Sequence, residues 1–118
     1  GKLANMYAEI GDVWLSSGLY REAIEEYRRA LALGPAFADV RSRLAGALRD
    51  AGEREQAIKE YEEVVRQSPN YVPARLNLGL SLYAAGRKDE AVKHWRAVLE
   101  ISPGNKNAEM YLQLAGVA

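Results

Sequence analysis

Histidine and cysteine, which often carry out catalysis or bind metals, are scarce in this sequence. The chain has one histidine, His94, which could act as a general base because the ordinary pKa of histidine lies near neutral pH. The sequence pattern places no nucleophile or acid beside it, and it lies between Lys93 and Trp95 on a helical segment. Because the chain has no cysteine, only this imidazole and carboxylates remain as metal ligands. We therefore interpret His94 as a partly exposed helix residue and predict no catalytic residue, metal site, cofactor or enzyme activity.

The charged residues favour an ordinary solvated surface. Sixteen basic and 16 acidic residues cancel, so the chain lacks the net positive charge on which nonspecific nucleic-acid binding depends. The arginines between residues 21 and 49 are interleaved with acids, and no glycine-rich phosphate loop occurs. Adjacent acids such as Glu62 and Glu63 do not converge on one substrate, because neighbouring helix residues point in different directions. We expect no nucleic-acid partner.

The sequence does not identify a compartment. No segment is apolar over the roughly 20 residues that a membrane-spanning helix needs, so we expect no membrane insertion. No signal peptide is visible at the start of the chain. We interpret Gly1 as an expression scar or an excision point, so a targeting signal upstream of it would be invisible. The absence of cysteine is compatible with any redox compartment. The localisation stays unknown, with the cytoplasm slightly favoured.

The chain repeats a pattern of residue types with a period of 34 residues. A proline, a glycine, an alanine and an aromatic residue each recur three times in register: Pro35, Pro69 and Pro103; Gly18, Gly52 and Gly86; Ala23, Ala57 and Ala91; Tyr27, Tyr61 and Trp95. A fixed period of this size is typical of a solenoid, in which one supersecondary unit stacks on copies of itself. Such folds present extended binding surfaces.

Each period contains two helical segments. In the second period, Val40, Leu44 and Leu48 fall on one face at helical spacing, Gly52 ends the first segment, and Pro69 follows the second. The same pattern predicts helices over 4–17, 20–33, 38–51, 54–67, 72–85 and 88–101, with a seventh from 106 to about 116. Small residues in the first helices (Gly11, Ala45 and Gly79) should let two helix backbones approach closely, with the aromatic residues of the second helices filling the groove between neighbours.

The repeat resembles the tetratricopeptide repeat family, whose signature is W-x2-L-G-x2-Y, then A-x3-F, then P. The first period reads Tyr7-x2-Ile10-Gly11-x2-Trp14 and is followed by Ala23, Tyr27 and Pro35. In the second and third periods Arg41 and Arg75 replace the leading aromatic residue, and their stems should cover apolar surface while their heads stay in water.

The resemblance implies an all-α, right-handed α-α superhelix (a solenoid) of three helix-turn-helix repeats plus a C-terminal seventh helix. We expect a single domain over 1–118, with repeats at 4–37, 38–71 and 72–105. The remaining segment, 106–118, is either a capping helix or the first helix of a truncated fourth repeat. Whether the chain belongs to a longer array or a multidomain protein cannot be told from the sequence.

In this family the first helices line a concave groove that holds a peptide. The resemblance therefore implies a non-catalytic protein–protein interaction module that binds a partner peptide or helix. The groove residues are polar at the N-terminal end and apolar or aromatic at the C-terminal end: Asn5, Asp12, Arg43, Arg49, Leu76, Asn77, Leu80, Tyr83, Met110 and Tyr111.

Three alternatives are weighed against this interpretation. One subfamily clamps the C-terminal carboxylate of chaperone peptides with Lys, Asn, Asn, Lys and Arg, but the matching positions here are Ala8, Asp12, Arg43, Pro73 and Asn77, which do not suit a carboxylate. The apolar terminal helix also suggests a homo-oligomerising scaffold that assembles through its ends. The third alternative is an enzyme, or a regulatory segment of one, but the catalytic residues would then have to lie in a domain outside these 118 residues. The partner's identity and the oligomeric state cannot be read from the sequence.

Overall fold

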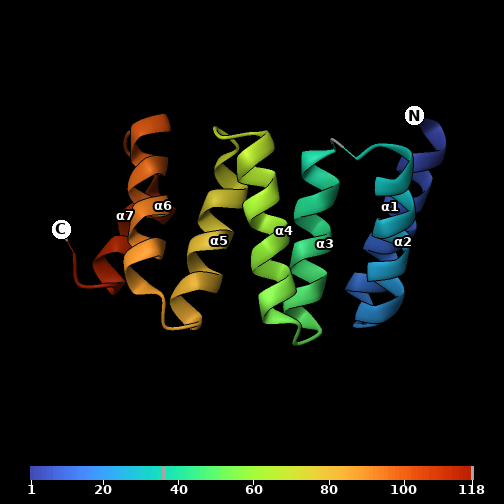
Figure 1. Cartoon of the computed structure of the whole chain (residues 1–118), viewed down its shortest axis with the longest axis horizontal. Helices are drawn as coiled ribbons and strands as arrows, with labels where there is room; N and C mark the ends of the chain where they lie inside the picture. Colours follow the sequence, from blue (N-terminus) through green and yellow to red (C-terminus); the bar gives the residue numbers. More distant parts are fainter. Residues whose placement is uncertain (36, 118) are drawn as a thin grey trace.

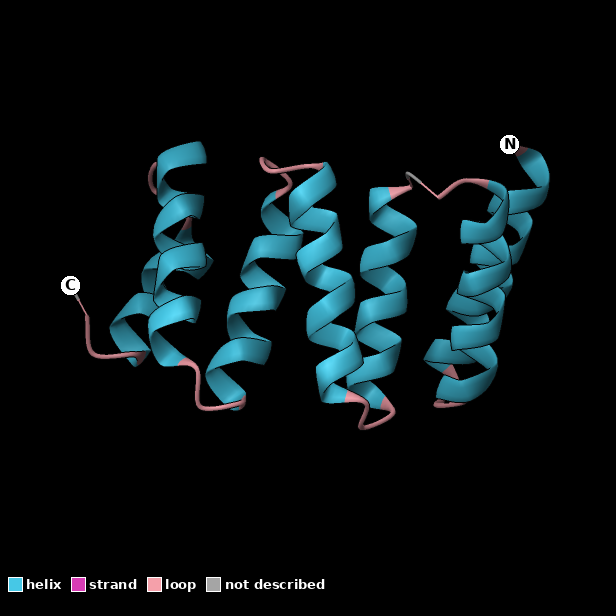
Figure 2. Cartoon of the chain, in the orientation of Figure 1, coloured by secondary structure: helices cyan, strands magenta, loops and turns pink. Residues whose placement is uncertain are grey.

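The computed structural model describes residues 1–35 and 37–117, and these residues form seven helices and no strand. The helices are α1 (Lys2–Ser16), α2 (Tyr20–Leu33), α3 (Ala38–Asp50), α4 (Arg54–Gln67), α5 (Val72–Ala84), α6 (Lys88–Ile101) and α7 (Lys106–Leu114). Short turns join them (Figure 2). Every expected helix is present, with ends at most two residues from those that the sequence predicts. The predicted all-α fold class is confirmed.

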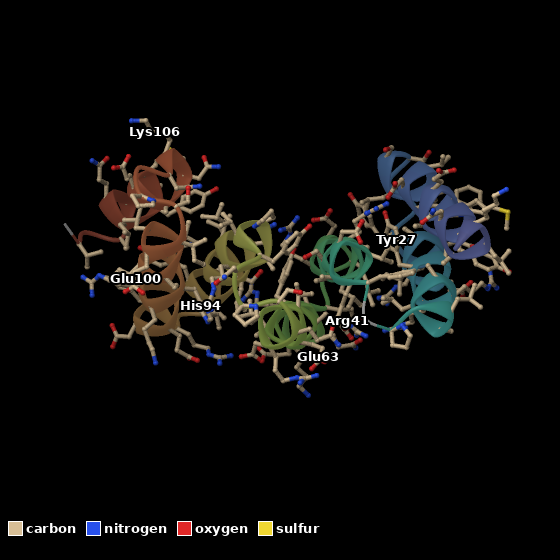
Figure 3. All side chains as sticks on the ribbon, turned by 90° about the horizontal axis from the view of Figure 1, so that it is seen from above. Tyr27, Arg41, Glu63, His94, Glu100 and Lys106 are labelled. Carbon is tan, nitrogen blue, oxygen red and sulfur yellow. The ribbon has the colours of Figure 1, made fainter. Side chains whose placement is uncertain are left out.

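The helices form a row of antiparallel pairs. Successive helices pack side by side from α1 at one end to α7 at the other (Figure 1), and the molecule measures 44 × 26 × 20 Å. Viewed from above, the row has two layers and curves, with α1, α3, α5 and α7 on its inner side and α2, α4 and α6 on its outer side (Figure 3). The structure is therefore an open helical solenoid, and the first helix of each repeat contributes to one continuous inner face.

The turn inside each repeat closes on a glycine whose backbone is left-handed. Gly52 has φ +88°, and the equivalent Gly18 and Gly86 have φ +77° and +82°. The amide of the residue that follows each glycine donates back to the first helix; Glu53 N, for example, lies 2.8 Å from Leu48 O. This bond satisfies a carbonyl at the helix end, and the positive φ explains why glycine recurs at this position.

The recurring aromatic residues occupy the centre of each repeat, because Tyr27, Tyr61 and Trp95 are almost fully buried. Their partners are the small residues of the first helices. A Cβ added to Gly11 would lie 2.6 Å from Cε1 of Tyr27, so the glycine makes room for the aromatic ring. The aromatic ring thus packs directly against the backbone of the first helix at this position.

Arg41 and Arg75 tie neighbouring repeats together. Arg41 donates to Pro35 O at 3.0 Å and to Glu60 Oε1 at 2.7 Å. Arg75 likewise donates to Pro69 O at 2.7 Å and lies 3.1 Å from Nδ1 of His94. Each guanidinium group joins the turn before its helix to the second helix of its own repeat, and its bond to the proline carbonyl is exposed to solvent.

Candidate functional site on the inner face

Apolar side chains gather at the C-terminal end of the inner face. Leu80 and Tyr83 of α5 are 37% and 42% exposed, and Met110 of α7 is 47% exposed. Leu76 and Tyr111 are partly buried and pack against the core of the third repeat. Large apolar side chains are usually covered in a folded protein, and a cluster that stays exposed on one face is typical of an interaction surface.

The buried ring of Trp95 supports this surface from behind. The indole of Trp95 lies between the rings of Tyr83 and Tyr111, with ring centroids 5.9 and 5.4 Å away, respectively. Its Nε1 donates to the carbonyl of Leu76 at 3.3 Å. Because Trp95 is buried in α6, it positions the two tyrosines of α5 and α7 before any ligand arrives.

A hollow of about 720 Å³ opens next to Leu80. Its lining comes from the end of α3, the turn that follows, the start of α4 and the C-terminal half of α5: Arg49, Gly52, Arg54, Glu55, Leu80, Ser81 and Ala84. The hydroxyl of Ser81 is buried and has no hydrogen-bond partner among the described residues. The hollow therefore combines an apolar wall with two guanidinium groups, as in a site that accepts an amphipathic segment.

The polar residues at the N-terminal end of the inner face bind one another. Asp12 accepts a hydrogen bond from the Tyr27 hydroxyl at 2.6 Å and another from Arg43 at 2.8 Å. Arg43 also donates to Asp39 at 2.9 Å. Burial and then the bond to Asp12 raise the pKa of Tyr27 above its ordinary value, so the phenol remains a donor. The network joins α1, α2 and α3 and leaves one negative charge in excess.

Arg49 forms a second polar group farther along the face. Its guanidinium lies 3.3 Å from Asp50 Oδ1 and donates to the Tyr61 hydroxyl at 3.4 Å. Burial is the main cause that raises the pKa of Tyr61. These bonds are long, and the Arg49 side chain is only partly covered, so it can turn toward a ligand without leaving a buried charge unpaired.

The residues predicted for the groove thus fall into three groups. In the first group, Asp12 forms an ion pair with Arg43. In the second, Arg49 and Leu80 line the same hollow. In the third, the rings of Tyr83 and Tyr111 both contact the indole of Trp95. Asn5 is exposed on α1 outside these groups, and Asn77 is partly buried on α5. Sequence reasoning missed Trp95 and Ser81 as parts of this region, because the repeat pattern assigns Trp95 to the core and gives Ser81 no distinctive signal.

His94 lies on α6 in the outer layer, and its Nδ1 is 3.1 Å from the guanidinium of Arg75. Burial and then the neighbouring charges of Arg75 and Lys93 lower the pKa of His94 below its ordinary value of 6.5. No group of three potential metal ligands occurs among the described residues. Within the same part of the chain, no helix has the length and apolar character required to cross a membrane.

Solved structures of similar shape are tetratricopeptide-repeat domains. The first such domain of Spaghetti (RPAP3), bound to the HSP90 peptide SRMEEVD, superposes with a TM-score of 0.91 at 24% identity and covers 98% of this chain and 91% of that one. The Arabidopsis OM64 domain gives 0.90 at 22% identity, covering 98% and 95%. The second domain of human RPAP3, in complex with the HSP70 peptide SGPTIEEVD, gives 0.85 at 27% identity, covering 98% and 99%.

The sequence comparisons agree with these structures. Among curated proteins, none matches the sequence significantly. A family model described as tetratricopeptide repeat matches residues 8–71 and again 42–106, which together span most of the chain. The chain therefore belongs to the tetratricopeptide repeat family.

Proposed function

We infer that this chain is a non-catalytic protein-interaction module whose inner face binds a peptide or helix of a partner protein. The observation that carries this proposal is the exposed apolar cluster of Leu80, Tyr83 and Met110 beside the hollow at Arg49. Burying these side chains against a partner would stabilise the complex by roughly 25 cal/mol for each Å² of apolar surface removed from water. Membership of a family of interaction scaffolds, together with peptide complexes among the similar structures, supports the same function.

The inner face suits a partner peptide that is an amphipathic segment better than one that ends in an acidic C-terminus. Apolar side chains of the segment would contact Leu76, Leu80, Tyr83, Met110 and Tyr111. Arg49 and Asn77 would orient its polar groups, since Arg49 lines the hollow beside Leu80 and Asn77 belongs to α5, the helix that carries Leu76, Leu80 and Tyr83. An acidic C-terminal tail would meet the excess negative charge of the Asp12–Arg43–Asp39 network instead.

The experiment selects peptides from a displayed library against the whole chain and measures the affinity of the selected peptides by calorimetry. Leu80→Glu and Tyr83→Ala should each weaken binding at least about tenfold, because removing or charging one central apolar contact costs on the order of 1.4 kcal/mol or more. Both side chains are partly exposed, so helicity measured by circular dichroism should not fall.

Leu33→Glu is the matched control, because Leu33 is an exposed leucine at the end of α2 in the outer layer. It should leave the affinity unchanged. The proposal is wrong if the selected peptides bind the Leu80 and Tyr83 variants as tightly as the original chain, or if the Leu33 variant loses as much affinity as they do.

A second candidate function is a scaffold that self-associates through its terminal helices. Exposed apolar side chains at both ends favour it: Leu3, Met6 and Val13 on α1, and Leu114 at the end of α7. Light scattering over a range of protein concentrations tests this candidate. A mass that grows with concentration and does not respond to salt would support it, and a monomeric mass throughout would exclude it.

A further inference from the structure

Basic side chains surround a small hollow between α5 and α6. The hollow has a volume of about 250 Å³, and five residues line it: Arg75, Glu90, Lys93, His94 and Ala97. Arg75 donates to Pro69 O at 2.7 Å and lies 3.1 Å from Nδ1 of His94. None of the ion pairs between described residues includes Arg75, Lys93 or His94. The hollow therefore holds two cations without a paired carboxylate.

The one acid of this lining, Glu90, is already engaged elsewhere. Its two carboxylate oxygens accept hydrogen bonds from Arg87, from Nε at 2.6 Å and from a second guanidinium nitrogen at 3.0 Å. The hydrogen bond from Arg87 is the main cause that lowers the pKa of Glu90. A two-pronged arginine contact of this kind uses both oxygens of a carboxylate, so Glu90 forms no ion pair with Arg75 or Lys93.

The surroundings of His94 reflect the balance of charge in the hollow. Burial is the main cause that lowers its pKa; the positive charges of Arg75 and Lys93 lower it further, and Glu90 raises it by less. The charges that act on the imidazole from the described part of the chain belong to α5 and α6, and none comes from α7, which also packs on α6. The two cations thus outweigh the acid, and the hollow is positive.

The second repeat supplies the equivalent arginine with a carboxylate. Arg41 lies 34 residues before Arg75 and also donates to the preceding proline carbonyl. It donates in addition to Glu60 Oε1 at 2.7 Å, and His94 stands at the position of Glu60 one period later. In Figure 3, Arg41 and His94 both lie between the two helices of their repeats. The third repeat therefore keeps the cation and replaces its internal counter-ion by an imidazole.

A second difference between the repeats leaves room for a ligand. Ala97 stands at the position of Glu63, so a methyl group replaces a longer acidic side chain at the wall of the hollow. The lysine is kept, because Lys93 matches Lys59. At the five lining positions the second repeat has two cations and two acids, whereas the third has two cations and one acid, which Arg87 binds.

We propose that this hollow binds a phosphate group, held by the guanidinium of Arg75, the ammonium of Lys93 and the imidazole of His94. A guanidinium donates to two oxygens at once, and an ammonium adds a compact positive charge. The doubly charged phosphate suits several cations better than a carboxylate does. Two sources share this chemistry: free inorganic phosphate and a phosphorylated side chain of a partner protein. The site is separate from the apolar cluster of the inner face and does not depend on it.

The test follows the His94 imidazole by NMR while inorganic phosphate is added to the whole chain. A bound anion favours the protonated ring, so phosphate should raise the pKa of His94 by at least about 0.5, which means that the protonated form binds phosphate at least about threefold more tightly. Sodium chloride and sodium acetate at the same ionic strength are the controls and should raise it less. An equal rise in chloride would assign the effect to screening, and an equal rise in acetate would assign the site to a carboxylate; either result overturns the proposal.

Variants that restore the carboxylates of the second repeat test the location of the site. His94→Glu and Ala97→Glu should each abolish the response of the amide resonances of residues 93–97 to phosphate, because the cations are then paired within the chain. Lys93→Gln should weaken phosphate binding at least about threefold. Lys88→Gln, which changes an exposed lysine of α6 outside the lining, is the matched control and should have no effect.

Circular dichroism verifies that each of these variants is folded. The proposal is overturned if both glutamate variants keep the phosphate response, or if the Lys88 variant loses as much affinity as the Lys93 variant.

A short glycine–alanine peptide with one phosphoserine, compared with its unphosphorylated twin, distinguishes the two sources. Binding of the phosphopeptide at least about fivefold tighter than that of inorganic phosphate would assign the site to a phosphorylated partner, and equal or weaker binding would assign it to free phosphate. If the unphosphorylated twin binds the hollow as tightly as the phosphopeptide, the phosphate group is not what the site recognises, and the proposal is wrong.

Discussion

Gly79 of α5 lies directly against the indole of Trp95 in α6. A Cβ on Gly79 would come within 2.2 Å of Nε1 of Trp95, a distance that real Cβ atoms essentially never show. The same indole contacts the rings of Tyr83 and Tyr111 and donates to the carbonyl of Leu76. The missing side chain at position 79 therefore allows Trp95 to occupy the place from which it supports the apolar end of the inner face.

Replacing Gly79 by alanine should destabilise the chain. The added methyl group must displace the buried indole, and overpacking of this kind costs about 1–3 kcal/mol in the free energy of unfolding. Urea denaturation followed by tryptophan fluorescence measures this cost. In a Trp14→Phe background the fluorescence of the folded state also reports the displacement of Trp95, because Trp14 is the other tryptophan of the chain. The affinity for an inner-face peptide should fall as well, because Tyr83 and Tyr111 lose their common support.

Gly46→Ala is the matched control for this change. Gly46 also lies within a helix, but its nearest contacts to an added Cβ are 3.6 and 3.8 Å away, which is ordinary van der Waals distance. Alanine at such a position should stabilise the chain by roughly 0.5–1 kcal/mol, since it reduces the freedom of the unfolded chain. Equal effects of the two substitutions would show that Gly79 is not in close contact with Trp95.

The stability of the chain should depend on the protonation of His94. The pKa of His94 is lowered in the folded chain, mainly by burial, from its ordinary value of 6.5. The unfolded chain therefore binds this proton more readily, and the free energy of unfolding falls as the pH drops from about 6.5 toward the folded pKa. Above about pH 6.5 this contribution should be constant. Denaturation curves between about pH 5 and 8 measure the dependence.

Two variants isolate His94 from other titrating groups. His94→Gln should remove the part of the pH dependence that lies near pH 6. Arg75→Met removes a neighbouring positive charge, so the pKa of His94, followed by NMR of the imidazole, should rise toward its ordinary value. A folded pKa at or above the ordinary value in the original chain would contradict both expectations.

The HSP90 peptide SRMEEVD, which is bound in the Spaghetti (RPAP3) structure, should bind this chain weakly or not at all. Ala8, Asp12 and Pro73 stand where the chaperone-binding subfamily has Lys, Asn and Lys, and Arg43 is already paired with Asp12 and Asp39. Fluorescence polarisation with the labelled peptide measures the affinity. Dissociation constants in the low micromolar range would show that the inner face accepts an acidic C-terminus after all.

Much of the fold follows from the order of residue types along the chain. The glycine that ends each first helix, such as Gly52, and the proline after each second helix, such as Pro69, act through local backbone conformation. Apolar residues at helical spacing, such as Val40 and Leu44, identify the buried face without any knowledge of the neighbour. Because these signals recur every 34 residues, the sequence predicts the helices and their stacking.

The sequence predicts less of the candidate site than of the fold. The apolar cluster around Leu80 and Tyr83 is exposed on the inner layer, and its role as a binding surface stays a prediction. Asp12 and Arg43 are among the residues that the sequence predicts for the groove, yet the structure shows them bonded to each other across two repeats. A sequence pattern identifies which side of a helix a residue occupies, but it does not identify which of several charged neighbours lies within hydrogen-bonding distance.

Taken alone, the sequence determined the helical repeat, the turns and the residues at the centre of each repeat, because backbone preferences and helical periodicity are local properties. The tertiary structure decided which contacts those residues make: Gly79 with Trp95, Arg75 with His94, and α2 with α3. These contacts join residues that are far apart along the chain, so they depend on the distance between packed helices, and no local pattern contains that distance.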